Sequence, residues 1–258
     1  MSVTLTAHCL VKNEENFIGY AISSVIDFVD EVLVFDTGST DKTVAIIKQL
    51  QLTYPHKIIF EEKGSADKVR HTALRQEMIE RTKTDWFMIL DGDEVWKKEA
   101  VLEAVQIMNG GLYEGITSNF YECVGDVYHR HYKQSYTTAR FIKNGDVCWK
   151  GSYNEDAPYT KKGEDFFKTK KIYLLQHKFW HLTHLARSSK DREDYTSGGQ
   201  RINRRILTYC IVGRSITEPL PDVFKNSGMQ LSWTQSVVNF IILIVSRAMY
   251  KFKLFAHN

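Results

Sequence analysis

Short apolar runs alternate with longer amphipathic stretches along the first hundred residues of the chain. Successive runs begin about 27 residues apart, the length of a strand, a helix and two tight connections. The runs at 31–35, 57–60 and 86–90 are almost continuously apolar, as strands are when helices cover both faces of their sheet. The pattern therefore predicts an α/β fold with a mostly parallel sheet and helices on both faces.

Two of the amphipathic stretches have the period of a helix. Their apolar residues recur at intervals of three and four, which places them on one face of a helix. These positions are Ile18, Ile22, Val25 and Val29 in the first stretch, and Val101, Val105 and Met108 in the second.

The pattern changes after Asn109, where Gly110 and Gly111 follow. We divide the chain into an α/β half over 1–108, a second half of the same domain over 109–215, and a C-terminal helical extension over 216–258. In the last two parts we expect short strands at 115–121, 137–142 and 147–150, a helical region over about 177–209, and a basic, aromatic helix over 233–255.

Composition excludes several classes of protein. Hydrophobic residues make up 43% of the 258 residues and charged residues 25%, which is typical of a globular domain. A net charge of +3 is too small to indicate nucleic-acid binding. The four cysteines include no C-x-x-C pair and are expected to be free thiols in a reducing, cytoplasmic compartment.

No secretory signal and no membrane span is expected, because no run of about 18 apolar residues occurs. The segment 233–255 mixes aromatic and basic residues, so two interpretations stay open. It lies either in a membrane interface, as a peripheral contact at the cytoplasmic face, or against the domain as a core helix.

Polar and acidic clusters follow three of the expected strands. They occupy 12–15, 36–41 and 91–94. One such cluster would be ordinary turn chemistry. Three of them at the carboxyl ends of parallel strands meet at one edge, where ligands bind in open α/β sheets.

Asp91 and Asp93 are the sharpest signal among these clusters. Two carboxylates separated by one glycine at the end of a buried strand predict a site for Mg²⁺ or Mn²⁺. The alternative is an Asp that caps a helix beginning near Lys97.

The segments 10–15, 30–43 and 86–94 together resemble glycosyltransferase family 2, which has the GT-A fold. The resemblance covers roughly the first hundred residues. It implies a nucleotide-diphosphate sugar as donor substrate, with a UDP-linked sugar as the first expectation, and a divalent cation, Mn²⁺ or Mg²⁺, as cofactor.

The resemblance also implies roles for single residues. Asn13, Glu14 and Asp36 would line the nucleoside pocket. Arg70 would face the base and the diphosphate, although His71 stands where the family has Asn. Asp91 would contact the ribose or a metal-bound water, and Asp93 would bind the metal.

Inverting transfer also requires a base that deprotonates the acceptor. The segment 149–156 resembles the acidic motif on the family's acceptor side, with Asn154 in place of a histidine in one of two alignments. One alignment makes Asp156 the base and the other makes Glu155 the base. An exposed acidic turn before Pro158 is the alternative.

Three histidines, His177, His181 and His184, have the spacing of one helix face. In GT-A enzymes a histidine from this part of the chain often completes the metal site, and the resemblance implies that His184, or else His181, does so here. The alternative is ordinary helix packing.

The sequence therefore predicts a metal-dependent, inverting glycosyltransferase. Its acceptor, a glycan, a lipid-linked molecule or another compound, is not identified, and nucleic acid is not expected as a partner. Two rival hypotheses are a phosphatase of the haloacid-dehalogenase type, with Asp91 as nucleophile and Asp93 as acid/base, and a non-catalytic module that binds a nucleotide or a glycan.

Overall fold

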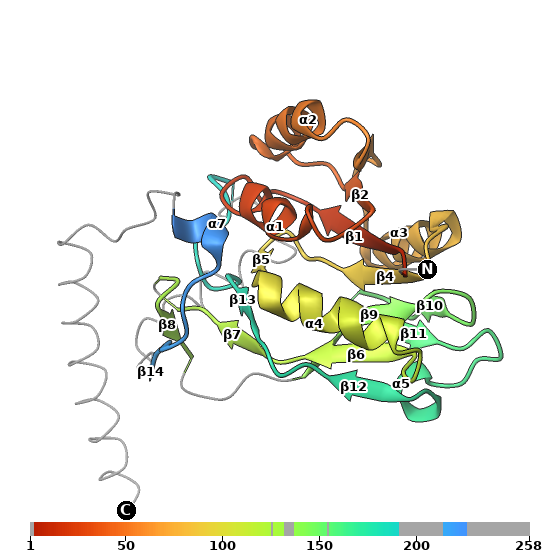
Figure 1. The fold of residues 1–258 in the computed structure, drawn as a ribbon. Helices are drawn as coiled ribbons and strands as arrows, with labels where there is room; N and C mark the ends of the chain where they lie inside the picture. Colours follow the sequence, from red (N-terminus) through yellow and green to blue (C-terminus); the bar gives the residue numbers. More distant parts are fainter. Residues whose placement is uncertain (1–2, 125, 132–136, 154, 191–213, 226–258) are drawn as a thin grey trace, which may run out of the picture.

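A computed structural model of the chain describes residues 3–124, 126–131, 137–153, 155–190 and 214–225. Its centre is a seven-stranded sheet in the order β12-β6-β9-β4-β1-β2-β3. All neighbouring pairs are parallel except those that β9 makes with β4 and β6 (Figure 1). The strands are β1 Leu5–Val11, β2 Glu31–Asp36, β3 Ile58–Glu62, β4 Trp86–Ile89, β6 Gly115–Ser118, β9 Thr138–Lys143 and β12 Ile172–Leu174.

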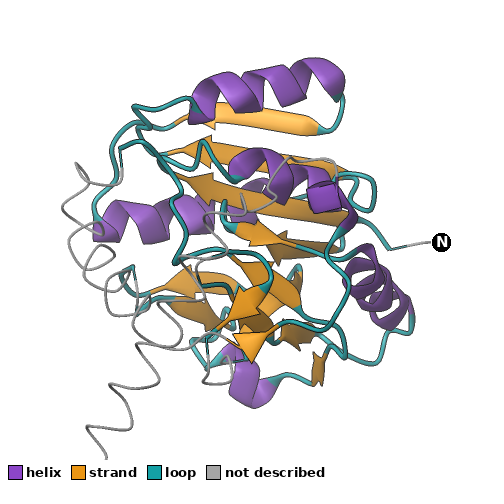
Figure 2. Ribbon diagram, turned by 90° about the vertical axis from the view of Figure 1, so that its left-hand side faces the viewer, coloured by secondary structure: helices purple, strands orange, loops and turns teal. Residues whose placement is uncertain are grey.

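Helices cover both faces of this sheet (Figure 2), which confirms the predicted α/β class. Three of them pack on one face and α3 packs on the other. The helices are α1 Ile18–Val25, α2 Thr43–Thr53, α3 Lys68–Arg81 and α4 Lys98–Asn109, with short helices α5 Phe166–Thr169 and α7 Asp222–Lys225.

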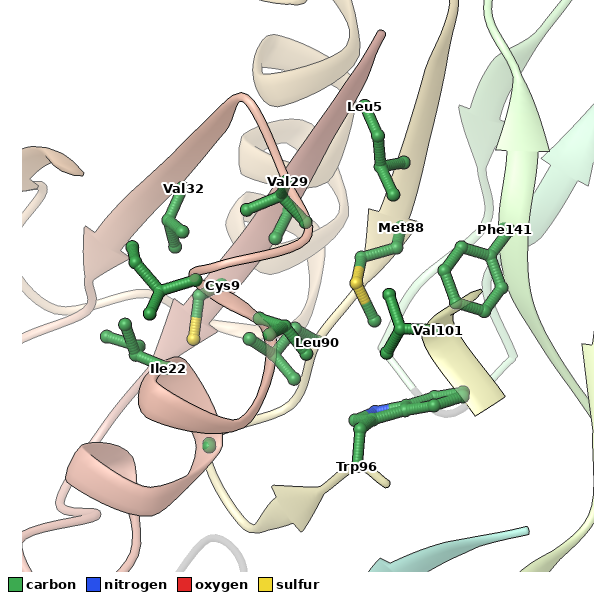
Figure 3. Packing of buried hydrophobic residues seen from close by; sticks show 14 of the residues in the cluster. Leu5, Cys9, Ile22, Val29, Val32, Met88, Leu90, Trp96, Val101 and Phe141 are labelled. Atoms are coloured by element: carbon green, nitrogen blue, oxygen red, sulfur yellow. The ribbon is translucent and has the colours of Figure 1, made fainter. Parts of the chain in front are cut away.

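Successive side chains of β1 point to opposite faces of the sheet, so this one strand packs against the helices on both sides. Cys9 and Val11 belong to the large core beneath α1 and α4, which also contains Met88 and Trp96 (Figure 3). Leu10 points the other way and packs in the cluster that includes residues of α3. A strand that is buried on both faces is therefore apolar almost throughout, as β1 is.

Smaller sheets extend the second part of the chain. The sheet β5-β13-β7 joins β5 Glu94–Val95, β13 Phe179–His181 and β7 Phe120–Glu122. Two-stranded sheets pair β10 Cys148–Lys150 with β11 Ala157–Tyr159, and β8 His129–Arg130 with β14 Arg214–Ser215.

The helix expected over 177–209 is wrong within the described residues, because 179–181 form strand β13. Phe179 and Trp180 are both fully buried but belong to different core clusters, on opposite sides of the strand. In a strand, adjacent side chains point to opposite faces, so both can be buried in different clusters, whereas a single buried face of a helix could not hold both in this way. Residues 191–209 lie outside the described part, as does the segment 233–255.

The strand expected at 115–121 is instead two strands, β6 and β7, which belong to different sheets. Among the described residues, no helix has the length and apolar character needed to cross a membrane.

Candidate active site

The ends of β1, β2 and β4 lie side by side, as the three polar clusters predicted. Val11 pairs with Asp36 at the ends of β1 and β2, and β4 runs parallel to β1 on its other side. The loops that follow are joined by hydrogen bonds: Asn13 N donates to Ser39 Oγ at 2.8 Å, and Thr40 N donates to Asn13 Oδ1 at 2.8 Å. Asn13 has φ +53°, a left-handed conformation that Asn tolerates better than most residues.

Asp36 is 2% exposed at the end of β2. Its Oδ2 accepts hydrogen bonds from the backbone N–H of Gly38 and Ser39, both at 2.9 Å. Its Oδ1 is buried and has no hydrogen-bond partner among the described residues. A buried acceptor atom that lacks a hydrogen bond within the protein can accept one from an N–H or O–H group of a bound ligand.

Glu14 lies against the turn that follows β4. A Cβ on Gly92 would stand 2.8 Å from Glu14 Cγ, so only glycine permits this approach. Arg187 donates from NH1 to Glu14 Oε1 at 2.9 Å, and both side chains are more than nine-tenths buried. The segment around Arg187 is also bound to the two strand-end loops, through Asn16 N to Arg187 O at 2.9 Å and Ser188 Oγ to Asp41 Oδ2 at 2.5 Å.

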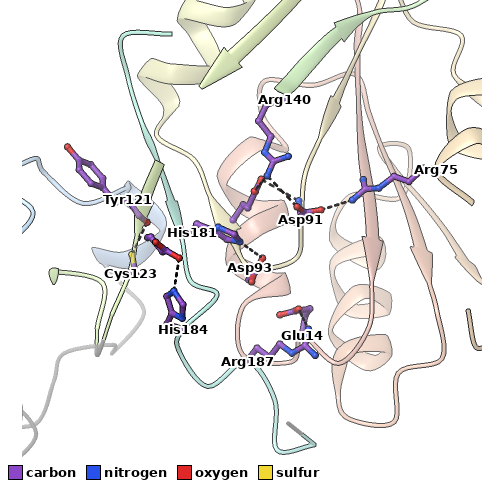
Figure 4. A network of polar contacts seen from close by, with 12 residues as sticks. Glu14, Arg75, Asp91, Asp93, Tyr121, Cys123, Arg140, His181, His184 and Arg187 are labelled. Carbon is purple, nitrogen blue, oxygen red and sulfur yellow. Dashed lines mark hydrogen bonds and ion pairs between the residues drawn. The ribbon is translucent and has the colours of Figure 1, made fainter. Parts of the chain in front are cut away.

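Asp91 lies between two arginines that the sequence analysis did not select (Figure 4). Arg75 NH2 is 2.6 Å from Asp91 Oδ1, and Arg140 NH2 is 3.4 Å from Oδ2. Loss of water acts to raise the pKa of Asp91, but the two guanidinium groups outweigh it and hold that pKa below its ordinary value.

Glu94 lies beside Asp91 and Arg140 and is fully buried. It accepts a hydrogen bond from Arg140. Burial raises the pKa of Glu94 to about 7, although Arg140 opposes the shift.

Asp93 faces His181, with Oδ1 3.4 Å from His181 Nε2. Burial acts to lower the pKa of His181, but Asp93 and Glu94 outweigh it and raise the pKa to about 9. Of the three histidines expected on one face, His181 is the one beside Asp93. His184 Nε2 instead lies 2.7 Å from Glu122 Oε1.

The described residues contain no group of three or more His, Cys, Asp or Glu side chains that forms a complete metal site. A cation that travels with a nucleotide does not need one, because phosphate oxygens and water supply most of its ligands. Asp93 and His181 fit that requirement, since a carboxylate oxygen and the imidazole Nε2 face each other, and a cation bound between them would replace the proton of His181.

The acceptor-side segment is held against α3. Asp156 Oδ2 accepts hydrogen bonds from Trp149 Nε1 at 2.7 Å and from Thr72 Oγ1 at 3.3 Å. Glu155 is exposed. The two candidate bases therefore differ, because only Asp156 has an oxygen fixed by two donors.

Arg70 is exposed on the first turn of α3, and its NH2 donates to the carbonyl of Lys63 at 2.9 Å. His71 is partly buried, with its ring centroid 4.3 Å from that of Tyr153. Burial, and then Arg75, lower the pKa of His71 to about 4, so its imidazole is neutral at pH 7.

Comparison with known proteins agrees with this geometry. The family model described as Glycosyl transferase family 2 matches residues 9–182. The chain is 29% identical over 157 residues to the SPbeta prophage-derived glycosyltransferase SunS of Bacillus subtilis, over 59% of this chain and 34% of SunS. It is 26% identical to the uncharacterized glycosyltransferase MG060 of Mycoplasma genitalium, over 63% of this chain and 54% of that protein.

The chain thus spans between about a third and a half of these relatives. Among solved structures, S. aureus TarS has a similar fold, with a TM-score of 0.50 and 11% identity, over 80% of this chain and 43% of TarS.

Proposed function

Because the chain belongs to glycosyl transferase family 2, we propose that it transfers a sugar from a nucleotide-diphosphate sugar to a hydroxyl of an acceptor. A UDP-linked sugar is the first candidate for the donor, and a glycan or lipid-linked molecule is the candidate acceptor. The observation that carries the proposal is the meeting of three strand ends at one edge of the sheet, with Asn13 after β1, Asp36 at the end of β2, and Asp91 and Asp93 after β4.

In this proposal the nucleoside lies over the ends of β1 and β2. The open oxygen of Asp36 accepts a hydrogen bond from it, and Asn13 and Glu14 form the wall of its pocket. Arg70 stands at the rim, on the first turn of α3, where a guanidinium can approach a phosphate.

Asp93 and His181 would hold the Mn²⁺ or Mg²⁺ ion. When bound, the cation acts as a Lewis acid that stabilises the negative charge developing on the leaving diphosphate. His181 takes the role that the sequence analysis gave first to His184, because His181 faces Asp93 at 3.4 Å.

We assign the base to Asp156. The acceptor oxygen attacks the anomeric carbon of the donor while the bond from that carbon to the phosphate oxygen breaks. The acceptor proton passes to Asp156, and the nucleoside diphosphate leaves with the electron pair. A single displacement of this kind inverts the anomeric configuration. Hydrogen bonds from Trp149 and Thr72 fix one oxygen of Asp156, which supports this choice over Glu155.

A screen of nucleotides and nucleotide sugars with Mn²⁺ by thermal shift tests donor binding, because a ligand of the native state raises its melting temperature. Turnover is then measured as release of nucleoside diphosphate. Asp93→Ala is expected to reduce turnover at least about a hundredfold, the scale of losing a main electrostatic stabiliser.

Asp27→Ala is the matched control, since Asp27 is exposed beyond the end of α1. Near-normal turnover in Asp93→Ala would refute the role of Asp93. A protein that binds nucleotide but turns over no nucleotide sugar, with any acceptor or with water, would instead be a non-catalytic binding module.

The phosphatase hypothesis loses its support. The family match covers the D-G-D segment, and the carboxylate of Asp91 is bound to Arg75 and Arg140 rather than presented as a nucleophile.

A further inference from the structure

Glu122 on β7 lies beside the proposed cation site, on the same face of the three-stranded sheet β5-β13-β7 as His181. Strands β7 and β13 are parallel, and Glu122 pairs directly with His181. Side chains that are directly opposite in two paired strands lie on one face of their sheet. Phe120 shares this face, because its ring meets the His181 ring edge to face with centroids 5.1 Å apart. Tyr121 and Trp180 point to the other face and belong to the second core cluster.

The carboxylate of Glu122 is held by a histidine and remains partly open. His184 Nε2 lies 2.7 Å from Glu122 Oε1, and the His184 side chain is 11% exposed, whereas that of Glu122 is 31% exposed. His131, just after β8, donates from its backbone N to Glu122 O at 2.8 Å. Its Nδ1 lies 4.0 Å from Glu122 Oε2, beyond hydrogen-bond distance. One carboxylate oxygen is therefore fixed, and the other can accept a hydrogen bond from a ligand.

The charge of Glu122 limits the kind of ligand that it can bind. The hydrogen bond from His184 lowers the pKa of Glu122 below its ordinary value and outweighs the loss of water, which acts to raise it. Glu122 is therefore ionised at pH 7. An ionised carboxylate accepts hydrogen bonds but donates none, and it repels a phosphate. Glu122 thus suits a hydroxyl group and not the diphosphate.

The order of the strands places Glu122 beyond the cation site as seen from the nucleoside pocket. That pocket lies over β1 and β2, Asp93 follows β4 and directly precedes β5, and β13 and β7 come next in the smaller sheet. The labelled side chains follow this order from Asp93 through His181 to His184 (Figure 4). Neighbouring strands are about 4.8 Å apart, so Glu122 is one such step from His181. In a nucleotide sugar the diphosphate joins the nucleoside to the sugar, so the sugar extends past the cation toward β7.

We propose that Glu122 is a specificity-determining residue that accepts a hydrogen bond from a hydroxyl of the sugar being transferred, and that His184 is the positioning residue that fixes its carboxylate. This inference rests on the proposed function. It separates recognition of the uncharged sugar from the binding of the nucleoside and of the cation. A site built to bind a hydroxyl rejects an analogue that lacks it, because the protein group is then left without its partner.

The first test compares two probes by isothermal titration calorimetry in the presence of Mn²⁺. They are the nucleotide sugar that raises the wild-type melting temperature most in the screen described above, and the same nucleoside diphosphate without its sugar. Glu122→Ala should weaken binding of the nucleotide sugar about tenfold more than binding of the nucleoside diphosphate, the scale of one hydrogen bond to a charged group. The ratio of the two Kd values isolates the sugar contact, because any change in cation binding or in folding is shared by both probes. An unchanged ratio would overturn the inference.

The second test uses nucleotide sugars that each lack one ring hydroxyl. One of them should bind the wild type about tenfold more weakly than the complete sugar does, and should bind Glu122→Ala as well as the complete sugar does. His184→Asn should give a smaller change in the Kd ratio than Glu122→Ala, since the carboxylate is kept but no longer fixed. If every analogue loses the same affinity in the wild type and in Glu122→Ala, Glu122 contacts no sugar hydroxyl and the inference fails.

Glu103→Ala is the matched control, because Glu103 on α4 also pairs with a histidine, with Oε2 2.8 Å from His177 Nδ1. This pair lies beside β12, where Glu103 also accepts from Tyr173 OH and from Gln176 N. Glu103→Ala should lower the melting temperature and leave the Kd ratio unchanged. If Glu122→Ala behaves in the same way, Glu122 is structural and the inference alone fails. Absence of binding of any nucleotide sugar by the wild type would overturn the proposed function, and this inference with it.

Discussion

At the scale of single residues, neighbouring carboxylates in this chain differ by their contacts rather than by their chemistry. Glu155 is exposed, whereas Asp156 is held by Trp149 and Thr72. We expect Asp156→Asn to lower kcat by about a hundredfold or more, the usual contribution of a general base, and Glu155→Gln to change it by less than about threefold. The assay is initial-rate kinetics at saturating donor. The reverse ranking would move the base to Glu155.

His8 gives a second prediction, on stability. It is fully buried on β1, stacks on Phe87 and lies 2.5 Å from Thr82 Oγ1. Burial lowers the pKa of His8 to about 3. Below about pH 6.5 this histidine binds a proton in the unfolded chain but not in the folded chain. Its contribution to the free energy of unfolding is therefore fully present above pH 6.5 and is lost as the pH falls toward 3.

His8→Gln should therefore flatten the decline of unfolding free energy between pH 6.5 and 5 by up to about 1.4 kcal/mol per pH unit. Urea unfolding of both proteins across this range measures the difference. Parallel curves for the wild type and the variant would show that His8 does not titrate in this way.

The residues that sequence reasoning missed share one cause. Arg75 and Arg140 lie 16 and 49 positions from Asp91, and each, read in the sequence, is a charged residue of ordinary spacing in a helix or a strand. Only the packing of α3 and β9 around the end of β4 brings them together. The carboxylates, by contrast, could be selected because each follows directly after an apolar strand.

At the scale of elements, the turn between β10 and β11 depends on Gly151. It has φ +112°, and a Cβ there would stand 2.8 Å from Asp156 Cα and 2.8 Å from Glu155 O. We expect Gly151→Ala to displace Asp156 and to reduce turnover at least about tenfold, with a loss of about 1–3 kcal/mol of stability from backbone strain.

Gly163→Ala separates the two effects. Gly163 also has a positive φ, of +90°, but a Cβ there meets nothing closer than Lys150 Nζ at 3.9 Å. Both variants should lose stability in thermal unfolding because of the positive φ, Gly151→Ala more than Gly163→Ala because of its clash, and only Gly151→Ala should lose turnover. Equal turnover in the two variants would mean that the turn does not position Asp156.

The elements themselves could be predicted to different degrees. Strands β1 to β4 are mostly apolar, and their runs are long enough for the pattern to be read in the sequence. Strand β13 has three residues, and its partners β5 and β7 are far away in sequence. Local periodicity cannot report such pairing, and the spacing of the histidines suggested a helix instead.

At the scale of the whole molecule, the parts 1–108 and 109–215 share one sheet and one core. Strand β9 of the second part pairs with β4 of the first, and Phe141 packs in the same cluster as Met88. We therefore expect the described domain to unfold in one cooperative transition. Far-ultraviolet and near-ultraviolet circular dichroism, followed in urea, should give the same midpoint. Separate midpoints would show that residue 108 is a boundary between folding units.

Helix α3 contacts both sides of the proposed reaction. It reaches Asp91 through Arg75, and it reaches the loop that carries Asp156 through Thr72 and through Gln76, which accepts from Trp149 N at 2.7 Å. A shift of this helix on nucleotide binding would be transmitted to the acceptor loop within a few ångströms. Thermodynamic linkage then requires each substrate to alter the affinity of the other by one common factor, so this helix would couple the binding of donor and acceptor to the same extent whichever of them binds first.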